Sequence, residues 1–444
     1  MASGSATHCH PRRRPFLNVL LLGSGAREHA IAWKLSQSPK LTNLYVAPGN
    51  PGTADVAINL AVDLDDFDAI VHIGREYRID LTVVGSEGPL AAGLVDRLLV
   101  EGFAAFGPTK AAAIIESSKV FSKRFMERIG VPTAPFGVFD NEAEARKYVD
   151  VRTDATAGQL VVKAEGLALG KGVIVTATAE EAQAAVTNML SGRQFGDSST
   201  RVVVEQRLFG PEVSAHAFTD GQTVAHMPFS CDHKPIFDGD EGPNTGGMGA
   251  YSPPGWFSEA DQQWIRENVT EAIIKAMYDE GLPYRGVLYP GILCADEGMM
   301  VLEFNSRFGD PEAQVLFPRM DSDLLEVMWA VANNKLADVE LRWSDQACVG
   351  VVLASGGYPV KYETGLPIKG LDDLDPDVLV FHAGTARQDD GTLVTSGGRV
   401  LTVSALGPNL QAARDKAYRN VERISFEGMH YRRDIGARAG ASAN

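Results

Sequence analysis

The sequence predicts a multidomain protein of mixed α/β and α+β class, and three observations support this prediction. Strand and helix patterns alternate over residues 17–107, as in a parallel sheet covered by helices. From Ser117 onward the pattern changes to short β-rich runs separated by glycine turns. The 444 residues also exceed one ordinary domain and allow roughly two to four.

Strand–helix alternation defines the first expected domain, residues 17–116. An apolar run ends in Gly23-Ser24-Gly25, a helical pattern follows, and a second strand closes at a proline- and glycine-rich turn. This βαβ rhythm predicts a parallel sheet of Rossmann-like type. The expected strands are residues 17–22, 43–47, 81–85 and 103–107, and the expected helix is residues 28–35.

The rest of the chain divides into a long middle region, residues 117–342, and a β-rich end, residues 343–436. A helix opens the middle region, and two later strands form a hairpin across Asp296-Glu297-Gly298. Residues 1–16 and 437–444 are expected to be loose tails. The first of them lacks the apolar core of a secretory signal, and a remnant of a transit segment is the alternative. The expected strands are residues 159–164, 172–176, 202–205, 287–295, 299–305 and 350–354, and the expected helices are residues 119–129 and 410–421.

Composition and charge restrict the class of protein. Apolar residues make up 45% and charged residues 22%, an ordinary globular balance, and no stretch approaches the ~20 apolar residues of a membrane helix. The formal net charge of −16 argues against a nucleic-acid partner. Four scattered cysteines without paired spacing indicate a reducing compartment and no disulfide or zinc site. We therefore expect a cytoplasmic protein with neither a membrane nor a nucleic-acid partner.

The loop from Gly23 to Glu28 lies between the first strand and the first helix, where G-x-G is typical of dinucleotide binding. Two features disfavour NAD: Glu28 occupies the third glycine position, and the second strand ends without an acidic residue for a ribose. Backbone N–H groups at a helix start still form a good anion cradle, and Arg27 beside them would suit a sugar phosphate. A tight turn that only permits helix–strand packing is the alternative.

A second glycine-rich loop follows Lys163 and connects two expected strands. It is not a Walker A loop, because only three residues separate Gly166 from Gly170 and neither Ser nor Thr follows Lys171. A lysine followed by flexible glycines can still clamp a polyphosphate, the lysine by its charge and the glycines by their exposed N–H groups. An ordinary hairpin with surface lysines is the alternative.

The segment EFNSRFGDPE, residues 303–312, carries the clearest chemical signature. Strand alternation places Glu303, Asn305 and Arg307 on one face and the apolar side chains on the other. Two oxygen ligands in register suit a hard magnesium ion, and an arginine beside them suits a transferred phosphoryl group. The segment therefore predicts phosphoryl transfer, with a salt-bridged surface strand as the alternative.

Two weaker signals accompany that segment. Residues 202–205 form a strand that turns into a charged segment, where backbone groups can meet an adenine and Glu212 a ribose; a solvated strand end is the simpler explanation. Residues 242–249 form a long glycine-rich loop behind Asp232-His233-Lys234. Because glycines cost backbone entropy on ordering, such a loop is expected to approach a ligand or to move.

In combination, five segments closely resemble the phosphoribosylamine–glycine ligase family, also called the glycinamide ribonucleotide synthetases. They are VLLLGSGAREHA, VAPGNPGTA, VVKAEGLALGKGV, DHKPIFDGDEGPNTGGMGAYSP and VLEFNSRFGDPEAQ, in this order. The resemblance extends from about Leu17 to about Arg438, and GPNTGGMGAYSP joined to EFNxRFGDPE is specific among ATP-grasp enzymes. It implies a pre-ATP-grasp domain, an ATP-grasp domain with a mobile lid over about residues 134–204, and a C-terminal β-rich domain.

The implied reaction joins glycine to 5-phosphoribosylamine through glycyl phosphate, and yields glycinamide ribonucleotide, ADP and phosphate in purine biosynthesis. The implied cofactors are ATP and Mg²⁺ or Mn²⁺, and a monomer or weak dimer is expected. The resemblance implies ATP contacts for Lys119, Lys163, Gly166, Gly170, Lys171, Gly172, Glu205, Leu208 and Glu212. It implies Glu303 and Asn305 as metal ligands, and Arg307, Asp310, Lys234 and Asp232 as catalytic groups. It implies substrate contacts for Gly25, Arg27, Glu28, Asn50, Glu87, Asn244, Thr245, Gly246 and Gly247.

Some positions depart from the family pattern. Ala26 stands where a glycine is common, and Glu165 stands where an aspartate is usual. The stretch expected to face Glu303 reads Tyr289-Pro290-Gly291, although many ATP-grasp enzymes place an acidic metal ligand there, so the ligands of a second metal are not identified. Three rivals stay open: an ATP-grasp ligase for another acid or amine, an NAD-dependent dehydrogenase, and a non-catalytic nucleotide-binding module.

Overall fold

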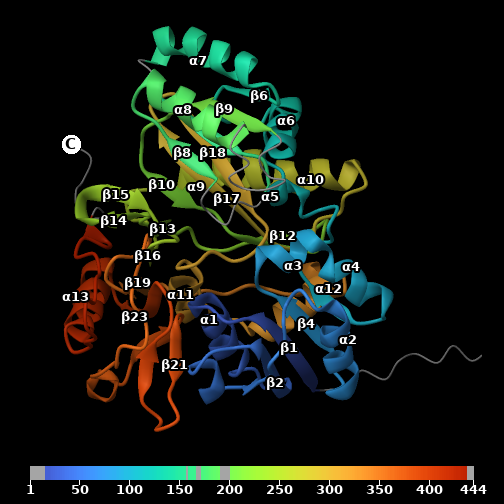
Figure 1. The fold of residues 1–444 in the computed structure, drawn as a ribbon. Helices are drawn as coiled ribbons and strands as arrows, with labels where there is room; N and C mark the ends of the chain where they lie inside the picture. The colour runs from blue at the N-terminus through green and yellow to red at the C-terminus, as the bar shows by residue number, and fades with distance from the viewer. Residues whose placement is uncertain (1–15, 157–158, 167–171, 191–200, 438–444) are drawn as a thin grey trace, which may run out of the picture.

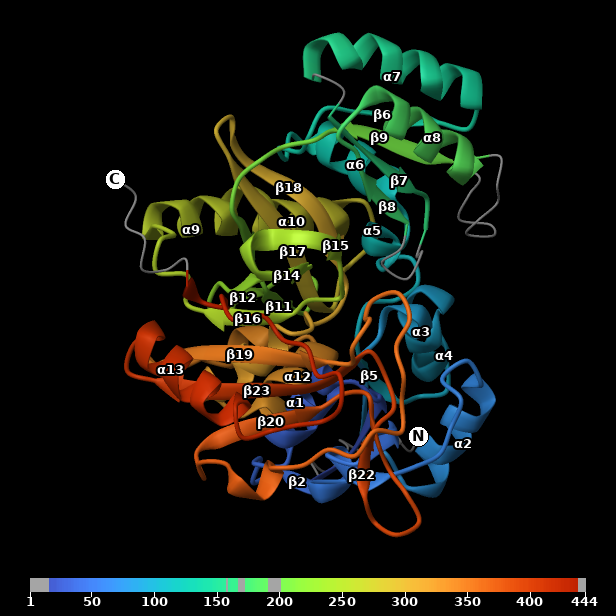
Figure 2. The ribbon, with the colours of Figure 1, turned by 60° about the vertical axis from the view of Figure 1, so that its left-hand side comes forward.

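The computed structural model describes residues 16–156, 159–166, 172–190 and 201–437. Its N-terminal sheet (blue) and the long strands of its C-terminal sheet (orange to red) lie side by side, with the middle region above them and a small α/β unit at the far end (Figure 1). Figure 2 shows the same layering after a turn of 60°, with the small unit still apart from both terminal sheets. No described helix is long and apolar enough to span a bilayer.

A five-stranded parallel sheet forms the N-terminal unit, which confirms the predicted βαβ pattern. Its order is β3-β2-β1-β4-β5, so the first strand in sequence lies at the centre. Val19 and Leu21 of that strand pack on the side of α1, whereas Leu20 and Leu22 pack on the side of α2, α3 and α4. The apolar run at the start of the sequence is therefore continuous because helices cover both faces. The strands are β1 Leu17–Gly23, β2 Leu41–Pro48, β3 Ile58–Asn59, β4 Leu81–Val84 and β5 Ala104–Phe106, and the helices are α1 Ala26–Leu35, α2 Phe67–Glu76, α3 Glu87–Ala92 and α4 Leu94–Val100.

The middle region is built around the predicted hairpin, now β17 Gly286–Ala295 and β18 Gly298–Asn305. The strands are antiparallel, and their register places Gly291 opposite Glu303 and Tyr289 opposite Asn305. No acidic residue of β17 therefore lies opposite Glu303 or Asn305, as the sequence predicted. The other strands are β10 Glu212–Ser214, β11 Ala217–Thr219 and β12 Val224–His226, and the helices are α5 Ile114–Ser117, α6 Lys119–Ile129, α9 Glu259–Ile265, the π-helix η4 Arg266–Glu271, α10 Ala272–Asp279, α11 Ala313–Leu316 and α12 Leu324–Ala332.

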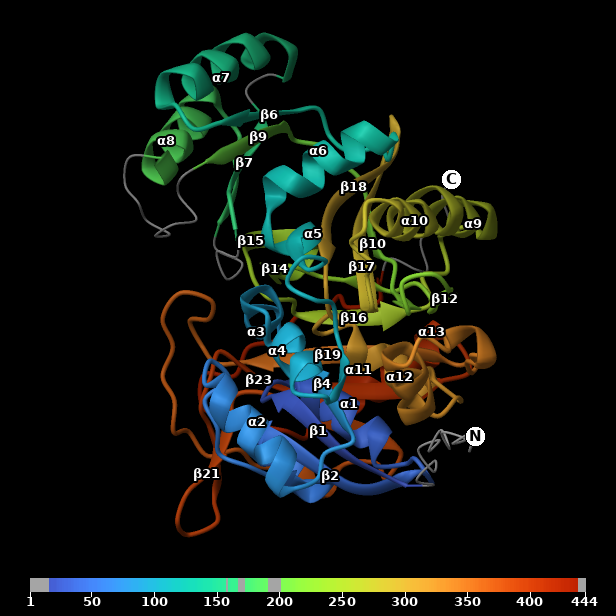
Figure 3. The same ribbon diagram turned by 90° about the vertical axis from the view of Figure 1, so that its right-hand side faces the viewer.

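A small α/β unit lies above the hairpin, inside the segment expected to be a lid. Its antiparallel sheet has the order β6-β9-β7-β8, and its core, which includes Val162, Val186 and Val204, is separate from the other hydrophobic cores. Figure 3 shows the unit beside α6, well away from the N-terminal and C-terminal sheets. Its elements are β6 Phe136–Phe139, α7 Glu142–Thr156, β7 Leu160–Ala164, β8 Val173–Val175, α8 Ala179–Leu190 and β9 Val202–Gln206.

The C-terminal sheet combines strands from both sides of the expected boundary between residues 342 and 343. Its order is β13-β16-β19-β23-β20, so two short strands of the middle region complete a sheet whose long strands lie near the end of the chain. The sequence did not predict this pairing, because strands this short carry little local pattern. The strands are β13 Cys231–Asp232, β16 Gly249–Ser252, β19 Ala347–Ala354, β20 Val378–His382 and β23 Arg399–Gly407, with the hairpins β14 Pro235–Phe237 with β15 Glu241–Asn244 and β21 Thr385–Arg387 with β22 Leu393–Thr395, and the helix α13 Leu410–Val421.

Candidate active site

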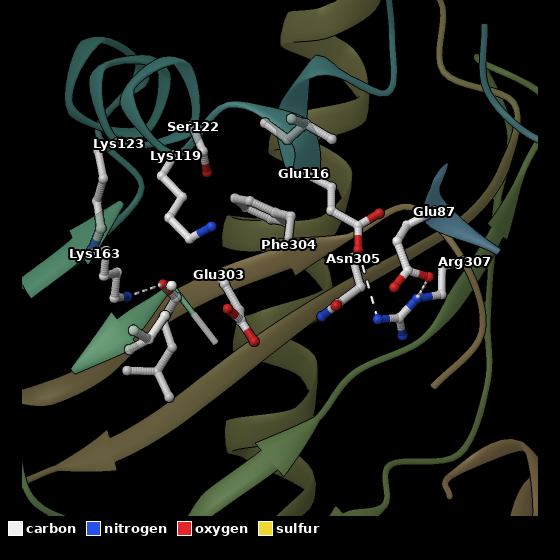
Figure 4. Close-up of a pocket in the computed structure, with 14 residues that line it drawn as sticks. Glu87, Glu116, Lys119, Ser122, Lys123, Lys163, Glu303, Phe304, Asn305 and Arg307 are labelled. Carbon is white, nitrogen blue, oxygen red and sulfur yellow. Dashed lines mark hydrogen bonds and ion pairs between the residues drawn. The ribbon is translucent and has the colours of Figure 1, made fainter. Parts of the chain in front are cut away.

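Side chains from α5, α6, β7 and β18 surround a cavity of about 150 Å³ (Figure 4). The cavity opens into a cleft of about 890 Å³ between the hairpin and the small α/β unit, and Lys163 and Glu303 line both spaces. A cleft of this volume suits a ligand the size of a nucleotide. The predicted site residues on the cavity wall are Glu87, Lys119, Lys163, Gly172, Glu303, Asn305 and Arg307. Those on the cleft wall are Lys163, Glu205, Leu208, Glu212, Asp232, Lys234, Asn244, Thr245 and Glu303.

The carboxylate of Glu303 points into the cavity beside the amide of Asn305, as strand alternation predicted (Figure 4). It makes no hydrogen bond or ion pair with any residue in the described part of the chain. Burial raises the pKa of this carboxyl, but four surrounding cations outweigh burial and hold the pKa below its ordinary value. These cations are Lys234, Lys163, Lys119 and Arg307. Glu303 is thus an ionised carboxylate inside the site without a fixed partner.

Glu303 and Asn305 fit a magnesium-type ion. Mg²⁺ prefers oxygen ligands and is usually bound by one or two carboxylates, with phosphate and water oxygens in its other positions. Among the described residues no group of three or more His, Cys, Asp or Glu side chains could hold a metal. Two protein oxygen donors beside a nucleotide-sized cleft agree with an ion that is shared with phosphates.

A buried charge cluster forms the wall between the cavity and the cleft. The Nζ of Lys163 on β7 lies 2.5 Å from Oε1 of Glu205 on β9, and Lys123 on α6 pairs with the other oxygen of the same carboxylate. Burial lowers the pKa of Lys123 to about 8 against the attraction of Glu205. Two ammonium groups share one carboxylate, so the wall carries excess positive charge where phosphates would lie. The sequence analysis missed Lys123, although its spacing from Lys119 on one helix face was a usable signal.

Lys119 connects α6 to the glycine-rich loop that follows β7. Its Nζ donates a hydrogen bond of 2.8 Å to the carbonyl of Gly166. Glu165 stabilises the start of the same helix, because its Oε2 accepts a hydrogen bond of 2.9 Å from the N–H of Val120. The glutamate that departs from the family pattern therefore has a structural role here. Gly170 and Lys171, predicted to contact ATP, lie outside the described residues.

Two carboxylates from the N-terminal side hold Arg307. Its Nε donates to Oε2 of Glu87 at 3.2 Å, and its Nη2 lies 3.7 Å from Oε1 of Glu116. Burial raises the pKa of Glu87, but Arg307 and Arg27 outweigh it and bring the pKa to about 2. For Glu116 burial prevails and raises the pKa. Glu87 was predicted as a substrate contact, and the structure places it against Arg307, which was predicted to be catalytic; no motif marked Glu116.

Asp232 and Lys234 line the cleft on its other side. The Nζ of Lys234 lies 2.5 Å from Oε2 of Glu212, so the carboxylate predicted to hold a ribose is paired with a lysine in this state. Burial, together with the charges of Glu312 and Glu212, raises the pKa of Asp232 to about 7 against the attraction of Lys234. An ionised Asp232 is costly without a cationic ligand.

The predicted substrate contacts in the N-terminal unit form one turn at the start of α1. The N–H of Gly25 donates to Oε2 of Glu28 at 2.8 Å, and Nε of Arg27 donates to Oε1 of Glu28 at 2.6 Å. Asn50 donates to the carbonyl of Ser24 at 2.8 Å. The N–H of Gly25, the first donor of the predicted anion cradle, is therefore already bonded to the carboxylate of Glu28. None of these residues lines the cavity or the cleft.

Arg27 links this turn to the EFNSRFGDPE segment, residues 303–312, because its Nη1 donates to the carbonyl of Phe308 at 3.3 Å. Asp310 lies on the same side, and its Oδ2 would be 3.7 Å from a Cβ added to Gly25. Asp310, Gly246 and Gly247 also lie outside both spaces. The structure thus brings the predicted residues together in two places, one around the cavity and cleft and one between the Gly25 turn and the Asp310 turn.

Profiles of the phosphoribosylglycinamide synthetase family match three consecutive parts of the chain: the N domain at residues 17–116, the ATP-grasp (A) domain at residues 117–313 and the C domain at residues 348–438. A phosphoribosylamine–glycine ligase of Halalkalibacterium halodurans is 47% identical over 426 residues, which cover 95% of this chain and 97% of the relative. A trifunctional purine biosynthetic protein of Gallus gallus is 50% identical over 425 residues, which cover 95% of this chain but 42% of that protein.

Solved structures agree with these sequence comparisons. The crystal structure of a phosphoribosylamine–glycine ligase from Thermotoga maritima matches with a TM-score of 0.81 and 34% identity, and the match covers 94% of this chain and 100% of that one. A biotin carboxylase domain from Hydrogenobacter thermophilus, solved with MgADP and bicarbonate, matches with a TM-score of 0.70 at 17% identity over 94% of this chain and 92% of that one. The second likeness shows a shared fold alone.

Proposed function

The chain belongs to the phosphoribosylglycinamide synthetase family, and we infer that it is an ATP-dependent ligase that joins glycine to 5-phosphoribosylamine. The products are glycinamide ribonucleotide, ADP and phosphate, in a step of purine biosynthesis. The observation that carries the proposal is Glu303, an ionised carboxylate without a fixed partner that faces four cations at the mouth of a nucleotide-sized cleft. This arrangement supports phosphoryl transfer, and the family supplies the acid and the amine.

ATP fits the cleft with its phosphates toward the cavity. The charged wall of Lys123, Lys163 and Glu205 would attract the phosphates, and backbone groups near Leu208 would meet the adenine. Glu303 and Asn305 would hold Mg²⁺ or Mn²⁺, which supplies neutralisation of phosphate charge when bound. The small α/β unit would close over the nucleotide as a lid, since its core is independent of the rest.

The reaction needs two displacements. A carboxylate oxygen of glycine attacks the γ-phosphorus of ATP, ADP leaves, and glycyl phosphate forms; Lys119 and Arg307 would stabilise charge on the transferred group. The amine of phosphoribosylamine then attacks the acyl carbon, phosphate leaves with the bridging oxygen, and the new amide nitrogen loses a proton. Exclusion of water by the closed lid would protect the acyl phosphate from hydrolysis.

Asp232 and Lys234 would position glycine at the cleft side of Glu303. Ionisation of the Asp232 carboxyl is unfavourable without a cationic ligand, and it becomes favourable beside the ammonium group of glycine. The turns at Gly25 and Asp310 would receive phosphoribosylamine. We further propose a cytoplasmic enzyme that is a monomer or weak dimer.

Replacing Asp232 with Asn should increase stability and weaken glycine binding. The folded-state pKa of about 7 lies above the ordinary value of 3.8 for this carboxyl, so the stability that it provides is present at low pH and is lost as pH rises through about 7. The thermal unfolding midpoint of Asp232→Asn should therefore exceed that of wild type at pH 8 and approach it at pH 5. The KM for glycine should rise on the order of tenfold or more, because a hydrogen-bonded charge partner is lost. A lower midpoint at pH 8, or an unchanged KM, would contradict this role.

ADP release with a panel of acids and amines tests the proposed function. Wild-type protein should release ADP only when glycine and phosphoribosylamine, generated in place, are both present. Alanine, serine and β-alanine test the alternative of an ATP-grasp ligase with another acid, and ammonia and ribosylamine test another amine. Release that depends on one of these instead would reject glycine or phosphoribosylamine as the substrate.

A further inference from the structure

Arg399, the first residue of β23, connects the C-terminal sheet to the 242–249 loop and to the Asp310 turn, and the proposed function places this turn at the sugar-amine site. Its Nη1 donates to the carbonyl of Gly246 at 2.5 Å and to the carbonyl of Asp310 at 2.9 Å. Its Nη2 donates to Oδ2 of Asp310 at 2.8 Å. One guanidinium group therefore bonds the 242–249 loop and the turn at residues 309–312 at the same time.

The fit between these loops leaves little free space. A Cβ on Gly246 would lie 3.1 Å from Cζ of Arg399, and a Cβ on Gly247 would lie 2.4 Å from Cδ of Pro311. Tyr358 supplies a second contact from the C-terminal region, since its hydroxyl accepts a hydrogen bond of 3.1 Å from the N–H of Gly246. Close approach, rather than chain flexibility alone, explains glycine at positions 246 and 247.

Asp310 is fully engaged in this junction. Its Oδ2 accepts from Arg399, and its Oδ1 accepts a hydrogen bond of 2.7 Å from Nε2 of Gln314, a completely buried side chain. The helix that follows, α11, packs against α1, β16 and β23, where the N-terminal, middle and C-terminal layers meet (Figure 1). Both carboxylate oxygens thus serve as fixed acceptors, which suits an anchor.

We propose that Arg399 is a positioning residue for the amine-transfer step. It holds the Gly246 loop and the Asp310 turn in one arrangement beside Gly25, and so shapes the place that phosphoribosylamine takes under the proposed function. A planar guanidinium group with fixed donors can bond two loops in one geometry, whereas a lysine ammonium group cannot reproduce it. Within the described part of the chain, no hydrogen bond or ion pair joins Arg399 to the side chains proposed to hold ATP on α6, β7 and β9, so we expect its loss to affect ATP binding less than binding of the sugar amine.

Arg399→Met, Arg399→Lys and the matched control Arg423→Met test this role kinetically. Arg423 is also a C-terminal arginine that bonds a carbonyl and a carboxylate, those of Asp373 and Asp375, at 2.7 and 2.8 Å. In Arg399→Met the KM for phosphoribosylamine should rise on the order of 10- to 100-fold, with the KM for ATP within about twofold of wild type. Arg399→Lys should recover part of the loss, and Arg423→Met should match wild type. Unchanged kinetics in Arg399→Met, equal rises in both KM values, or full recovery in Arg399→Lys would overturn the proposal.

Hydrogen–deuterium exchange gives a readout that does not depend on the enzyme's substrates. Amides of residues 244–249 and 309–313 should exchange faster in Arg399→Met than in wild type, while those of β7 and β9 keep their rates. Arg423→Met should leave all four segments unchanged. If these amides exchange in Arg399→Met at the wild-type rate, the proposal is overturned even if the enzyme ligates glycine. If the wild-type protein has no ligase activity, the proposed function is rejected, and the exchange rates still decide whether Arg399 holds the two loops. If Arg399→Met does not fold, Arg399→Lys decides by the same two measurements.

Discussion

Glu303→Gln is expected to lower turnover on the order of 10³-fold or more while the fold stays intact. The substitution keeps the shape of the side chain and removes its negative charge from a position that faces four cations. Because the carboxylate makes no hydrogen bond or ion pair within the described part of the chain, its loss breaks no structural contact. The expected effect is therefore on metal and phosphate binding, with the unfolding midpoint close to that of wild type.

The matched control is Glu297→Gln at the tip of the same hairpin, where the side chain is exposed. This substitution makes the same change of charge in the turn that joins β17 to β18, and it should leave turnover unchanged. Mn²⁺ titration in the presence of a non-hydrolysable ATP analogue measures metal affinity directly, and Glu303→Gln should bind the ion much more weakly. Wild-type turnover in Glu303→Gln would reject Glu303 as a metal ligand.

Glu205→Gln is expected to destabilise the protein by about 3–5 kcal/mol, the usual cost of removing one partner from a buried ion pair. Glu205 is 2% exposed and Lys123 is 3% exposed, so the two lysines that share this carboxylate cannot exchange it for water. Burial already lowers the pKa of Lys123 to about 8 with Glu205 present. Without the carboxylate, the folded protein must hold two ammonium groups close together or lose a proton from one.

Chemical denaturation with and without MgATP measures this effect. Bound triphosphate brings negative charge to the same wall, so MgATP should stabilise Glu205→Gln by more than it stabilises wild type. Glu280→Gln, which removes the partner of exposed Arg128, is the control and should cost less than about 1 kcal/mol. If the free energy of unfolding falls by a similar amount in both variants, the buried ion pairs contribute no more to stability than the exposed one.

Sequence reasoning succeeded where a local pattern carries the structure. The hairpin of β17 and β18, the helix α6 and the helix α13 follow from apolar periodicity and turn residues, and alternation along β18 placed Glu303 and Asn305 together. Glu28 was noticed as a break in a dinucleotide pattern and was predicted, from the family resemblance, as a substrate contact. The structure explains it, because this carboxylate bonds the N–H of Gly25 at the start of α1.

Sequence reasoning missed residues whose importance arises from distant partners. Glu116 and Lys123 enter the site through contacts with Arg307 and Glu205, which lie far along the chain. Arg399 has no motif of its own, and its role depends on a C-terminal sheet that includes β13 and β16 of the middle region. Such pairings are tertiary, and apart from the spacing of Lys123 from Lys119 on one helix face, a single sequence carries no local signal for them.

Transfer of ¹⁸O from glycine to phosphate tests most directly whether this enzyme activates glycine as an acyl phosphate. The measurement uses glycine labelled in both carboxylate oxygens, with ATP, Mg²⁺ and phosphoribosylamine, and ³¹P NMR of the phosphate produced. Glycyl phosphate chemistry moves the bridging oxygen to phosphorus, so each phosphate should carry a single ¹⁸O and the amide of the product should retain the other. Phosphate free of ¹⁸O, released together with glycinamide ribonucleotide, would contradict the acyl-phosphate route.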